Sequence, residues 1–301
     1  MLVLMANYVG RFAPSPTGPL HFGSLVAALA SWLDARAAGG RWLVRIEDLD
    51  GSRTQPGAAE SILRSLERMG LHWDGDIMRQ STRTDHYRDA LQRLTRDGHI
   101  YPCACTRREI ADSRAPLAPD GAQIYPGTCR AGLAPGRAAR AQRLRTGAET
   151  VRFTDRVQGE VAQALAQAIG DFVLWRADGQ YAYQLAVVVD DFAQGITDIV
   201  RGADLIESTA RQIYLQRLLG YSTPRYAHVP VALGAQGEKL SKQTGAAPMD
   251  ERNGAQNLLR ALDFLGMPAP AGISTADLLP WARLAWSVAR VPRRLGLRGS
   301  V

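Results

Sequence analysis

Residues 8–50 read YVGRFAPSPTGPLHFGSLVAALASWLDARAAGGRWLVRIEDLD, and this stretch decides the fold. Tyr8–Phe12 is a short β-prone run, and it ends in the proline- and glycine-rich segment 13–19, where regular structure has little room. Apolar residues then recur at helical spacing, a pair of glycines supplies a stop, and residues 42–46 form a second apolar run. A strand, a helix and a strand of these lengths make a βαβ unit. The sequence therefore predicts an α/β fold with a parallel sheet.

Further elements follow along the chain, and their apolar spacing predicts their type. The expected helices cover 57–69, 82–97, 205–219 and 276–287. The expected strands cover 151–153, 172–175 and 196–200, with a hairpin signal at Asp178-Gly179 before residues 181–183. Residues 106–150 are rich in Ala, Pro, Gly and Arg with weak periodicity, so we expect a partly loop-like insertion there.

The composition is that of a globular protein that can bury one large core. Of 301 residues, 46% are hydrophobic and 22% are charged, both ordinary values. No apolar run approaches the roughly 20 residues that a membrane helix needs, and the short apolar start lacks a basic leader, so we expect a cytoplasmic protein with no membrane partner. The net charge of +7 suits a polyanionic partner such as nucleic acid or ATP, although an Arg-rich composition alone also gives it.

Two glycine-bounded segments have the features of a phosphate site. Residues 16–24 (PTGPLHFGS) lead into the first helix, whose N-terminus offers unpaired N–H groups, and His21 there can donate hydrogen bonds to a triphosphate. The alternative for residues 16–24 is a Pro/Gly turn in which the histidine only caps the helix and no phosphate binds. Residues 237–245 (GEKLSKQTG) place two lysines three apart in a loop that can fold over ATP, and a solvated basic loop is the alternative.

These segments carry a family resemblance. RFAPSPTG at 11–18 with HFGS at 21–24 resembles the first signature of class I glutamyl-tRNA synthetases, and KLSKQ at 239–243 resembles their second, the mobile KMSKS-type loop. Ser24 and Gln243 depart from the usual signatures, but neither position carries the main phosphate contact in the family. The resemblance implies a class I synthetase fold, which is a Rossmann-like parallel sheet with helices on both faces and a small zinc-bearing insertion. It also implies that the protein uses ATP with Mg²⁺. It implies His21 and Lys242 as catalytic residues and His21, Gly23, Lys239, Ser241 and Lys242 as ATP-binding residues.

The resemblance also implies a pocket for L-glutamate. Such a pocket must neutralise two carboxylates and hold one ammonium, so it needs arginine and an acid at the carboxyl ends of parallel strands. Glu47 would accept from the α-ammonium, and Arg201 would pair with the γ-carboxylate. Ordinary strand-end salt bridges are the alternative for these two residues, and glutamine-specific relatives share much of the pattern. The candidate residues are Arg11, Phe12, Ala13, Pro14, Ser15, Glu47, Tyr183 and Arg201.

All three cysteines, Cys103, Cys105 and Cys129, lie within 27 residues. An odd count in a cytosolic chain argues against a disulfide framework and leaves a local metal site or three reduced thiols. The spacing Cys-x-Cys…Tyr-x-x-x-Cys resembles the glutamyl-queuosine tRNA(Asp) synthetases, a shorter member of the family. That resemblance implies one structural Zn²⁺ per chain, held by the three cysteines and Tyr125, with water as the alternative fourth ligand.

The tRNA chemistry follows from the same resemblance. Full-length glutamyl-tRNA synthetases carry a further anticodon-binding region, whereas 58 residues (244–301) follow Gln243 here. The resemblance implies glutamyl-adenylate formation without tRNA, then transfer of glutamate to a hydroxyl of queuosine in the anticodon of tRNA(Asp). Arg107, Arg108 and Arg130 are candidate contacts to the anticodon loop.

Three alternatives stay open at this point: a truncated synthetase that charges tRNA(Glu), a stand-alone amino-acid adenylating enzyme, and a non-catalytic zinc-containing RNA-binding paralogue. We expect a monomer. The expected domains are the first half of the catalytic domain (1–102), the zinc-bearing insertion (103–150), the second half with the KMSKS-type loop (151–250), and a short helical, Arg-rich C-terminal segment without an anticodon-binding domain (251–301).

Overall fold

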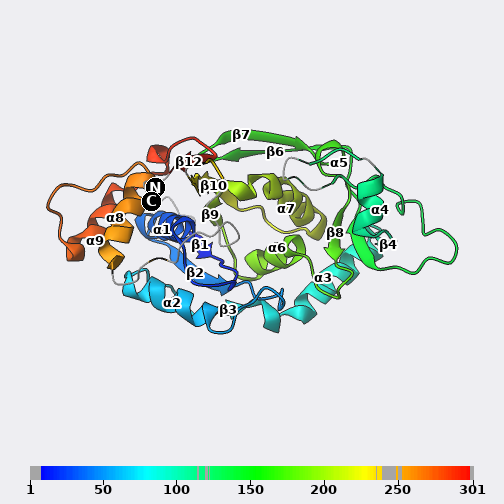
Figure 1. Cartoon of the computed structure of the whole chain (residues 1–301), viewed down its shortest axis with the longest axis horizontal. Coiled ribbons are helices and arrows are strands. Elements are labelled where there is room, and N and C mark those ends of the chain that lie inside the picture. The colour runs from blue at the N-terminus through cyan, green and yellow to red at the C-terminus, as the bar shows by residue number, and fades with distance from the viewer. Residues whose placement is uncertain are drawn as a thin grey trace, which may run out of the picture.

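A parallel sheet forms the centre of the protein (Figure 1). This computed structural model describes residues 8–113, 115–118, 121, 123–234, 236–238, 249 and 253–298. β2 (Arg41–Ile46) pairs in parallel with β1 (Val9–Phe12) and with β3 (Met78–Arg79). A second group has the order β7 (Gly159–Ala164), β6 (Thr150–Asp155), β10 (Arg225–Val229), β9 (Asp198–Gly202), with β6 and β7 antiparallel. The two groups meet where the Thr197 N–H donates to the Val9 carbonyl at 2.9 Å, which places β9 beside β1.

Helices cover both faces of this sheet, as predicted. Side chains of each strand alternate between two hydrophobic cores, so that Trp42 and Val44 of β2 join one core and Leu43 joins the other. The first core is completed by α1 (Phe22–Ala37), α2 (Ala58–Arg68), α8 (Gly254–Phe264) and α9 (Thr275–Ala285). The second is completed by α3 (Thr84–Arg96), α6 (Tyr183–Ala193) and α7 (Ile206–Leu219).

The helices predicted at 57–69, 82–97, 205–219 and 276–287 are confirmed within a few residues. Helices α6 and α8 were not predicted. The second arm of the hairpin expected at 181–183 is shorter than predicted, because Tyr183 opens α6. The hairpin signal at Asp178-Gly179 is confirmed by an antiparallel bridge between Trp175 and Tyr181.

The two ends of the insertion are more regular than a loop. β4 (Ile100–Cys103) pairs antiparallel with β5 (Ala141–Leu144), and β5 pairs antiparallel with β8 (Phe172–Trp175). Between β4 and β5, α4 (Arg107–Asp112) begins at a capping box formed by Thr106 and Glu109. The short helix α5 (Leu165–Ala168) precedes β8. This unit occupies the end of the molecule opposite α8 and α9 (Figure 1).

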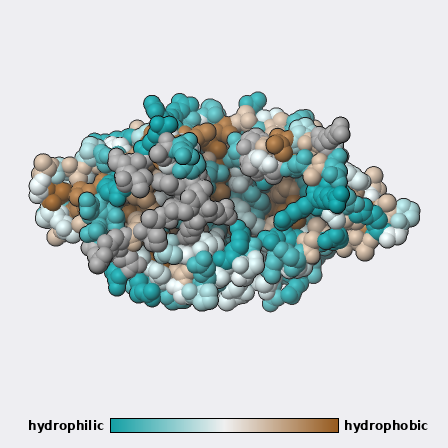
Figure 2. Space-filling view, viewed as in Figure 1, coloured by the Kyte–Doolittle hydropathy of each residue, from teal (hydrophilic) through white to brown (hydrophobic). Residues whose placement is uncertain are grey.

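The C-terminal segment folds back onto the catalytic domain. β12 (Gly296–Arg298) pairs in parallel with β11 (Val231–Leu233), and the Val231 N–H donates to the Leu295 carbonyl at 3.0 Å. Short 3-10 turns cover Gln80–Thr82, Ala203–Leu205 and Val288–Arg290. Hydrophilic residues cover most of the face in Figure 2, with hydrophobic residues at the end where α9 lies. Among the helices in the described part of the chain, none is both long and apolar enough to cross a membrane.

Candidate active site and metal centre

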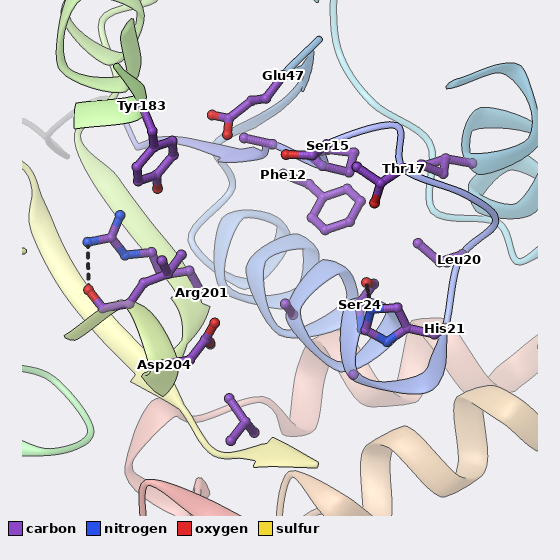
Figure 3. A pocket seen from close by; sticks show the side chains of 18 of the residues that line it. Phe12, Ser15, Thr17, Leu20, His21, Ser24, Glu47, Tyr183, Arg201 and Asp204 are labelled. Carbon is purple, nitrogen blue, oxygen red and sulfur yellow. Dashed lines mark hydrogen bonds between the residues drawn. The ribbon is translucent and has the colours of Figure 1, made fainter. Parts of the chain in front are cut away.

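A cavity of about 840 Å³ opens at the carboxyl ends of β1, β2, β9 and β10. All the residues predicted to bind glutamate line it, together with two of those predicted to bind ATP. They are Arg11, Phe12, Ala13, Pro14, Ser15, Glu47, Tyr183 and Arg201, with His21 and Gly23. Tyr183, Arg201 and Glu47 lie at one end, and His21 and Ser24 lie at the other (Figure 3). The predicted residues Lys239, Ser241 and Lys242 lie outside the described residues.

The proline-rich segment after β1 is held against the sheet edge by backbone hydrogen bonds. The Glu47 N–H donates to the Pro14 carbonyl at 3.0 Å, and the Gln55 N–H donates to the Pro16 carbonyl at 2.9 Å. These bonds place the segment between the ends of β1 and β2. The sequence signature is therefore the fixed wall of the cavity.

Behind the end of the cavity that contains Glu47 and Tyr183 lies a buried cluster of two arginines and two carboxylates. Asp191 accepts from Arg11 Nε at 3.1 Å and Nη2 at 3.2 Å, and its Oδ1 lies 2.8 Å from Arg45 Nη2. Arg45 also reaches Glu47 at 3.3 Å and donates to Gln194 at 2.7 Å. Burial acts to raise the pKa of Asp191, but the two guanidinium groups outweigh it and lower that pKa. Burial raises the pKa of Glu47, although Arg45 opposes the shift. The four charges in this cluster balance.

Sequence reasoning missed Arg45 and Asp191 as parts of the site. Two signals were available in the sequence. Arg45 lies within the apolar strand 42–46, and the pair Asp190-Asp191 directly follows the apolar run 185–189. Charged residues in apolar runs are buried only when they are paired, so each of these should have prompted a search for a partner.

Arg201 differs from Arg11 and Arg45 because no carboxylate pairs with it among the described residues. It lies on β9, is 5% exposed, and donates from Nε to His228 Nε2 at 3.0 Å. Its Nη2 donates to Thr209 Oγ1 at 2.8 Å and to the Leu205 carbonyl at 3.4 Å (Figure 3). Its buried Nη1 has no hydrogen-bond partner among the described residues. Next to it, burial raises the pKa of Tyr183.

His21 is the N-cap of α1. Its Nδ1 accepts from the Ser24 N–H at 3.3 Å, and its Nε2 lies 2.9 Å from Ser24 Oγ. The capping geometry considered from the sequence is therefore present, and it places the imidazole at the helix N-terminus that lines the cavity. The remaining lining residues, which the sequence did not single out, include Thr17, Asp204 and Val231.

The three cysteines and Tyr125 converge in the insertion. The Sγ atoms lie within 4.8 Å of one another, and those of Cys105 and Cys129 are 3.6 Å apart. Tyr125 Oη lies 3.4 Å from the Cys103 sulfur and 3.5 Å from the Cys105 sulfur, and it accepts from the Cys129 N–H at 2.8 Å. Burial acts to raise the pKa of Cys129, but hydrogen bonds from Tyr125 and a backbone N–H lower it to about 7.

These four side chains fit a tetrahedral metal centre. With metal–sulfur bonds of about 2.3 Å, tetrahedral geometry separates ligand sulfurs by about 3.8 Å, close to the spacing found here. Arg143 supplies a positive charge against the cluster, because its Nε donates to Cys103 Sγ at 3.3 Å and its guanidinium lies 3.8 Å from the centre of the Tyr125 ring. The cluster can therefore hold a metal ion with soft ligands.

The predicted RNA contacts separate into two groups. Arg107 and Arg108 lie exposed on α4, with the side chain of Arg108 91% exposed. Arg130 instead pairs with Asp171 and donates to the Thr146 carbonyl at 2.9 Å, so it fastens the insertion to the rest of the chain.

Comparison with known proteins agrees with this geometry. Residues 8–270 match the family described as tRNA synthetases class I (E and Q), catalytic domain. The chain is 59% identical to the glutamyl-Q tRNA(Asp) synthetase of Aromatoleum aromaticum, covering 96% of this chain and 91% of the relative. It is 57% identical to that of Dechloromonas aromatica, covering 95% and 96%.

A solved structure of a glutamate tRNA ligase from Elizabethkingia meningosepticum, in complex with its amino acid, is similar with a TM-score of 0.80. The two are 26% identical, and the match covers 98% of this chain and 67% of that one. A methionyl-tRNA synthetase from Mycobacterium tuberculosis shares the fold at a TM-score of 0.56 and 15% identity. The chain belongs to the class I tRNA synthetases of the glutamate and glutamine group, and within them to the glutamyl-Q tRNA(Asp) synthetases.

Proposed function

We propose that this enzyme activates L-glutamate with ATP to glutamyl-adenylate without tRNA and then transfers glutamate to queuosine in the anticodon of tRNA(Asp). The observation that carries the glutamate assignment is Arg201. Its buried guanidinium lines the cavity and leaves Nη1 without a hydrogen-bond partner among the described residues, whereas Arg11, which lines the same cavity, is paired with Asp191.

The charge balance favours glutamate over glutamine. Arg11 and Arg45 are matched by Asp191 and Glu47, so that cluster carries no net charge. The direct partners of Arg201 are an imidazole, a hydroxyl and a carbonyl, and burial lowers the pKa of that imidazole to about 4, so none of these partners carries a negative charge at neutral pH. A γ-carboxylate supplies the missing negative charge, whereas the neutral amide of glutamine does not. Tyr183 lines the same end of the cavity and would contact the same group.

The remaining groups of the amino acid have partners in the same cavity. Glu47 would accept a hydrogen bond from the α-ammonium, and Arg11 with Ser15 would orient the α-carboxylate. In activation, a carboxylate oxygen forms a bond to the α-phosphorus of ATP, and the bond from that phosphorus to the bridging oxygen breaks. Pyrophosphate leaves with its negative charge.

The triphosphate would lie over the N-terminus of α1, where His21 and Gly23 line the cavity. Helix N-termini favour anions because their N–H groups and dipole point outward. When bound, Mg²⁺ would neutralise phosphate charge. We propose that Lys239, Ser241 and Lys242 complete the ATP site, with Lys242 and His21 stabilising the charge that develops in the transition state.

The acceptor is the anticodon queuosine of tRNA(Asp), as the names of the 55–60% identical relatives suggest. A hydroxyl of queuosine would attack the adenylate carbonyl and release AMP, with no covalent enzyme intermediate. Arg107 and Arg108 on α4 are exposed and suit contacts to phosphates of the anticodon loop. We propose that the enzyme acts as a monomer in the cytoplasm, where this acceptor is found.

Zinc is the metal that best suits the cysteine cluster. Cys103, Cys105, Cys129 and Tyr125 would hold one Zn²⁺ in a closed, structural site. Burial raises the pKa of Tyr125, but the backbone hydrogen bond to its oxygen opposes that shift, and the guanidinium of Arg143 lies over its ring.

The test is transfer of labelled glutamate in the presence of ATP to tRNA(Asp) with and without queuosine. Transfer to the modified tRNA alone supports the proposal, and incorporation into tRNA(Glu) instead would make this a short conventional synthetase. Arg201→Met should abolish glutamate-dependent pyrophosphate exchange, while the exposed Arg108→Met should leave that exchange unchanged. Exchange that persists undiminished in Arg201→Met would contradict the glutamate assignment.

A further inference from the structure

Three adjacent strands carry a row of buried polar residues that leads to Arg201. In the sheet order β6-β10-β9, Asp155 ends β6, His228 lies on β10, and Arg201 lies on β9 directly opposite His228. Their exposures are 2%, 0% and 5%. Asp155 and His228 lie behind Arg201 and do not line the cavity, so the binding scheme above does not use them.

The hydrogen bonds of this row fix the protonation of His228. Its Nδ1 lies 2.6 Å from Asp155 Oδ2, and its Nε2 lies 3.0 Å from Arg201 Nε. An arginine Nε–H can only donate, so Nε2 must carry a lone pair, and the proton must be on Nδ1 and directed at Asp155. Burial lowers the pKa of His228 to about 4 despite the hydrogen bond to Asp155, which agrees with a neutral ring at neutral pH.

Asp155 is itself held in place by the backbone. Its Oδ1 accepts from the N–H groups of Val157 at 3.0 Å, Gln158 at 2.8 Å and His228 at 3.1 Å. With Oδ1 occupied in this way, Oδ2 is directed at the imidazole. Burial acts to raise the pKa of Asp155, but these donors and His228 outweigh it and lower that pKa.

We infer that Asp155 and His228 are positioning residues, which hold the guanidinium of Arg201 in the orientation that presents Nη1 to the γ-carboxylate of glutamate. This inference rests on the proposed function. The Nε bond to His228 and the Nη2 bond to Thr209 fix two edges of the planar guanidinium, and only Nη1 is left for a ligand. A carboxylate requires donors at defined angles, so an arginine that is free to rotate binds it less tightly.

A purely structural role for His228 makes a different prediction. A histidine that only fills the core would change stability, and it would alter the KM values for glutamate and ATP together or not at all. Positioning of Arg201 predicts a selective increase in the KM for glutamate. His21, which we propose contacts the triphosphate, lies toward the other end of the cavity (Figure 3).

Two substitutions of His228 separate these possibilities. His228→Asn keeps a donor near the position of Nδ1 but removes the acceptor for Arg201, whereas His228→Gln can place its amide oxygen near the position of Nε2. In glutamate-dependent pyrophosphate exchange, we expect His228→Asn to raise the KM for glutamate about 10- to 100-fold, as for loss of a hydrogen bond to a charged group. The KM for ATP should change less than about 3-fold, and His228→Gln should stay closer to the wild-type enzyme.

Asp155→Asn tests the same inference without altering the ring. Its amide N–H₂ would face Nδ1, which favours the tautomer with the proton on Nε2, and that proton would point at the Nε–H of Arg201. We expect the same selective increase in the KM for glutamate. Substitution of a catalytic-triad aspartate by asparagine acts through the tautomer in the same way.

The outcomes are distinguishable. If the wild-type enzyme shows no glutamate-dependent exchange, the proposed function fails, and the inference fails with it. If the wild-type enzyme exchanges but His228→Asn and Asp155→Asn leave the KM for glutamate unchanged, or raise both KM values equally, the inference alone is overturned.

Discussion

The ionised carboxylate of Asp191 should stabilise the fold as well as orient Arg11, and Asp191→Asn tests this. The carboxylate holds Arg11 through two hydrogen bonds and Arg45 through a third contact of 2.8 Å, with side chains at most 4% exposed. Asparagine keeps one acceptor oxygen but turns an N–H₂ group toward guanidinium donors. It also leaves Glu47 as the one remaining carboxylate of the four-residue cluster described above.

The expected cost follows from breaking a buried ion pair. Removing one partner of such a pair lowers the free energy of unfolding by about 3–5 kcal/mol. For a chain of this size that corresponds to a fall in Tm of about 6–10 °C. Since the pKa of Asp191 is lowered in the folded protein, its contribution is present above the unfolded pKa of about 4 and is lost as the pH falls through the folded pKa.

Urea unfolding followed by tryptophan fluorescence at pH 7.5 measures this effect. The matched control is Asp85→Asn, whose side chain is 78% exposed and pairs with Arg88 one helical turn away. The control should change the free energy of unfolding by less than about 0.5 kcal/mol. If Asp191→Asn is no less stable than this control at pH 7.5, then the buried cluster does not depend on an ionised Asp191.

Three further changes have defined outcomes. The pKa of His228 is about 4 in the folded protein and about 6.5 in the unfolded chain, so the contribution of this residue to the free energy of unfolding should fall by about 2–4 kcal/mol from pH 7 to pH 4. Urea titration of the wild-type protein and of His228→Gln measures this fall, and an equally steep fall in His228→Gln would contradict the prediction. Cys129→Ser should reduce bound zinc from one per chain toward none by elemental analysis, whereas full zinc content would refute the ligand assignment. Gly40→Ala places a Cβ 2.4 Å from the Tyr8 carbonyl oxygen and should lower the free energy of unfolding by about 1–3 kcal/mol, a result that an unchanged melting curve would exclude.

The surface helices of the fold were predictable because their apolar residues repeat at helical spacing. α6 was missed because Gln184–Asp191 are all buried, and a helix buried on every side shows no amphipathic period. Its run of three valines also favours a strand. The lining residues 11–15, His21, Gly23 and Glu47 could be assigned from family motifs, since those motifs occupy consecutive positions next to strand ends, whereas most of the other lining residues could not.

The buried residues that hold Arg201 from behind the cavity could not be predicted from motifs. Asp155 and His228 are 73 residues apart, and His228 and Arg201 are 27 apart. Their contact depends on the neighbours and register of three strands, which local spacing does not encode. The balance of Arg45 against Asp191 depends in the same way on how β2 and α6 meet.

The path of the chain also limits how much a metal ion bound to the cysteine cluster could stabilise the closure of the sheet. β1 meets the start of β9 through Val9 and Thr197, which are 188 residues apart, and that closure brings the two walls of the cavity together. A metal link between Cys105 and Cys129 would shorten this path by 24 residues. Loop-closure entropy grows only with the logarithm of loop length, so the shortcut favours sheet closure by only about 0.1 kcal/mol. Removal of the metal by a chelator should therefore unfold the insertion locally and leave the pairing of β1 with β9 almost unaffected. The insertion and the catalytic sheet would then behave as two separate cooperative units.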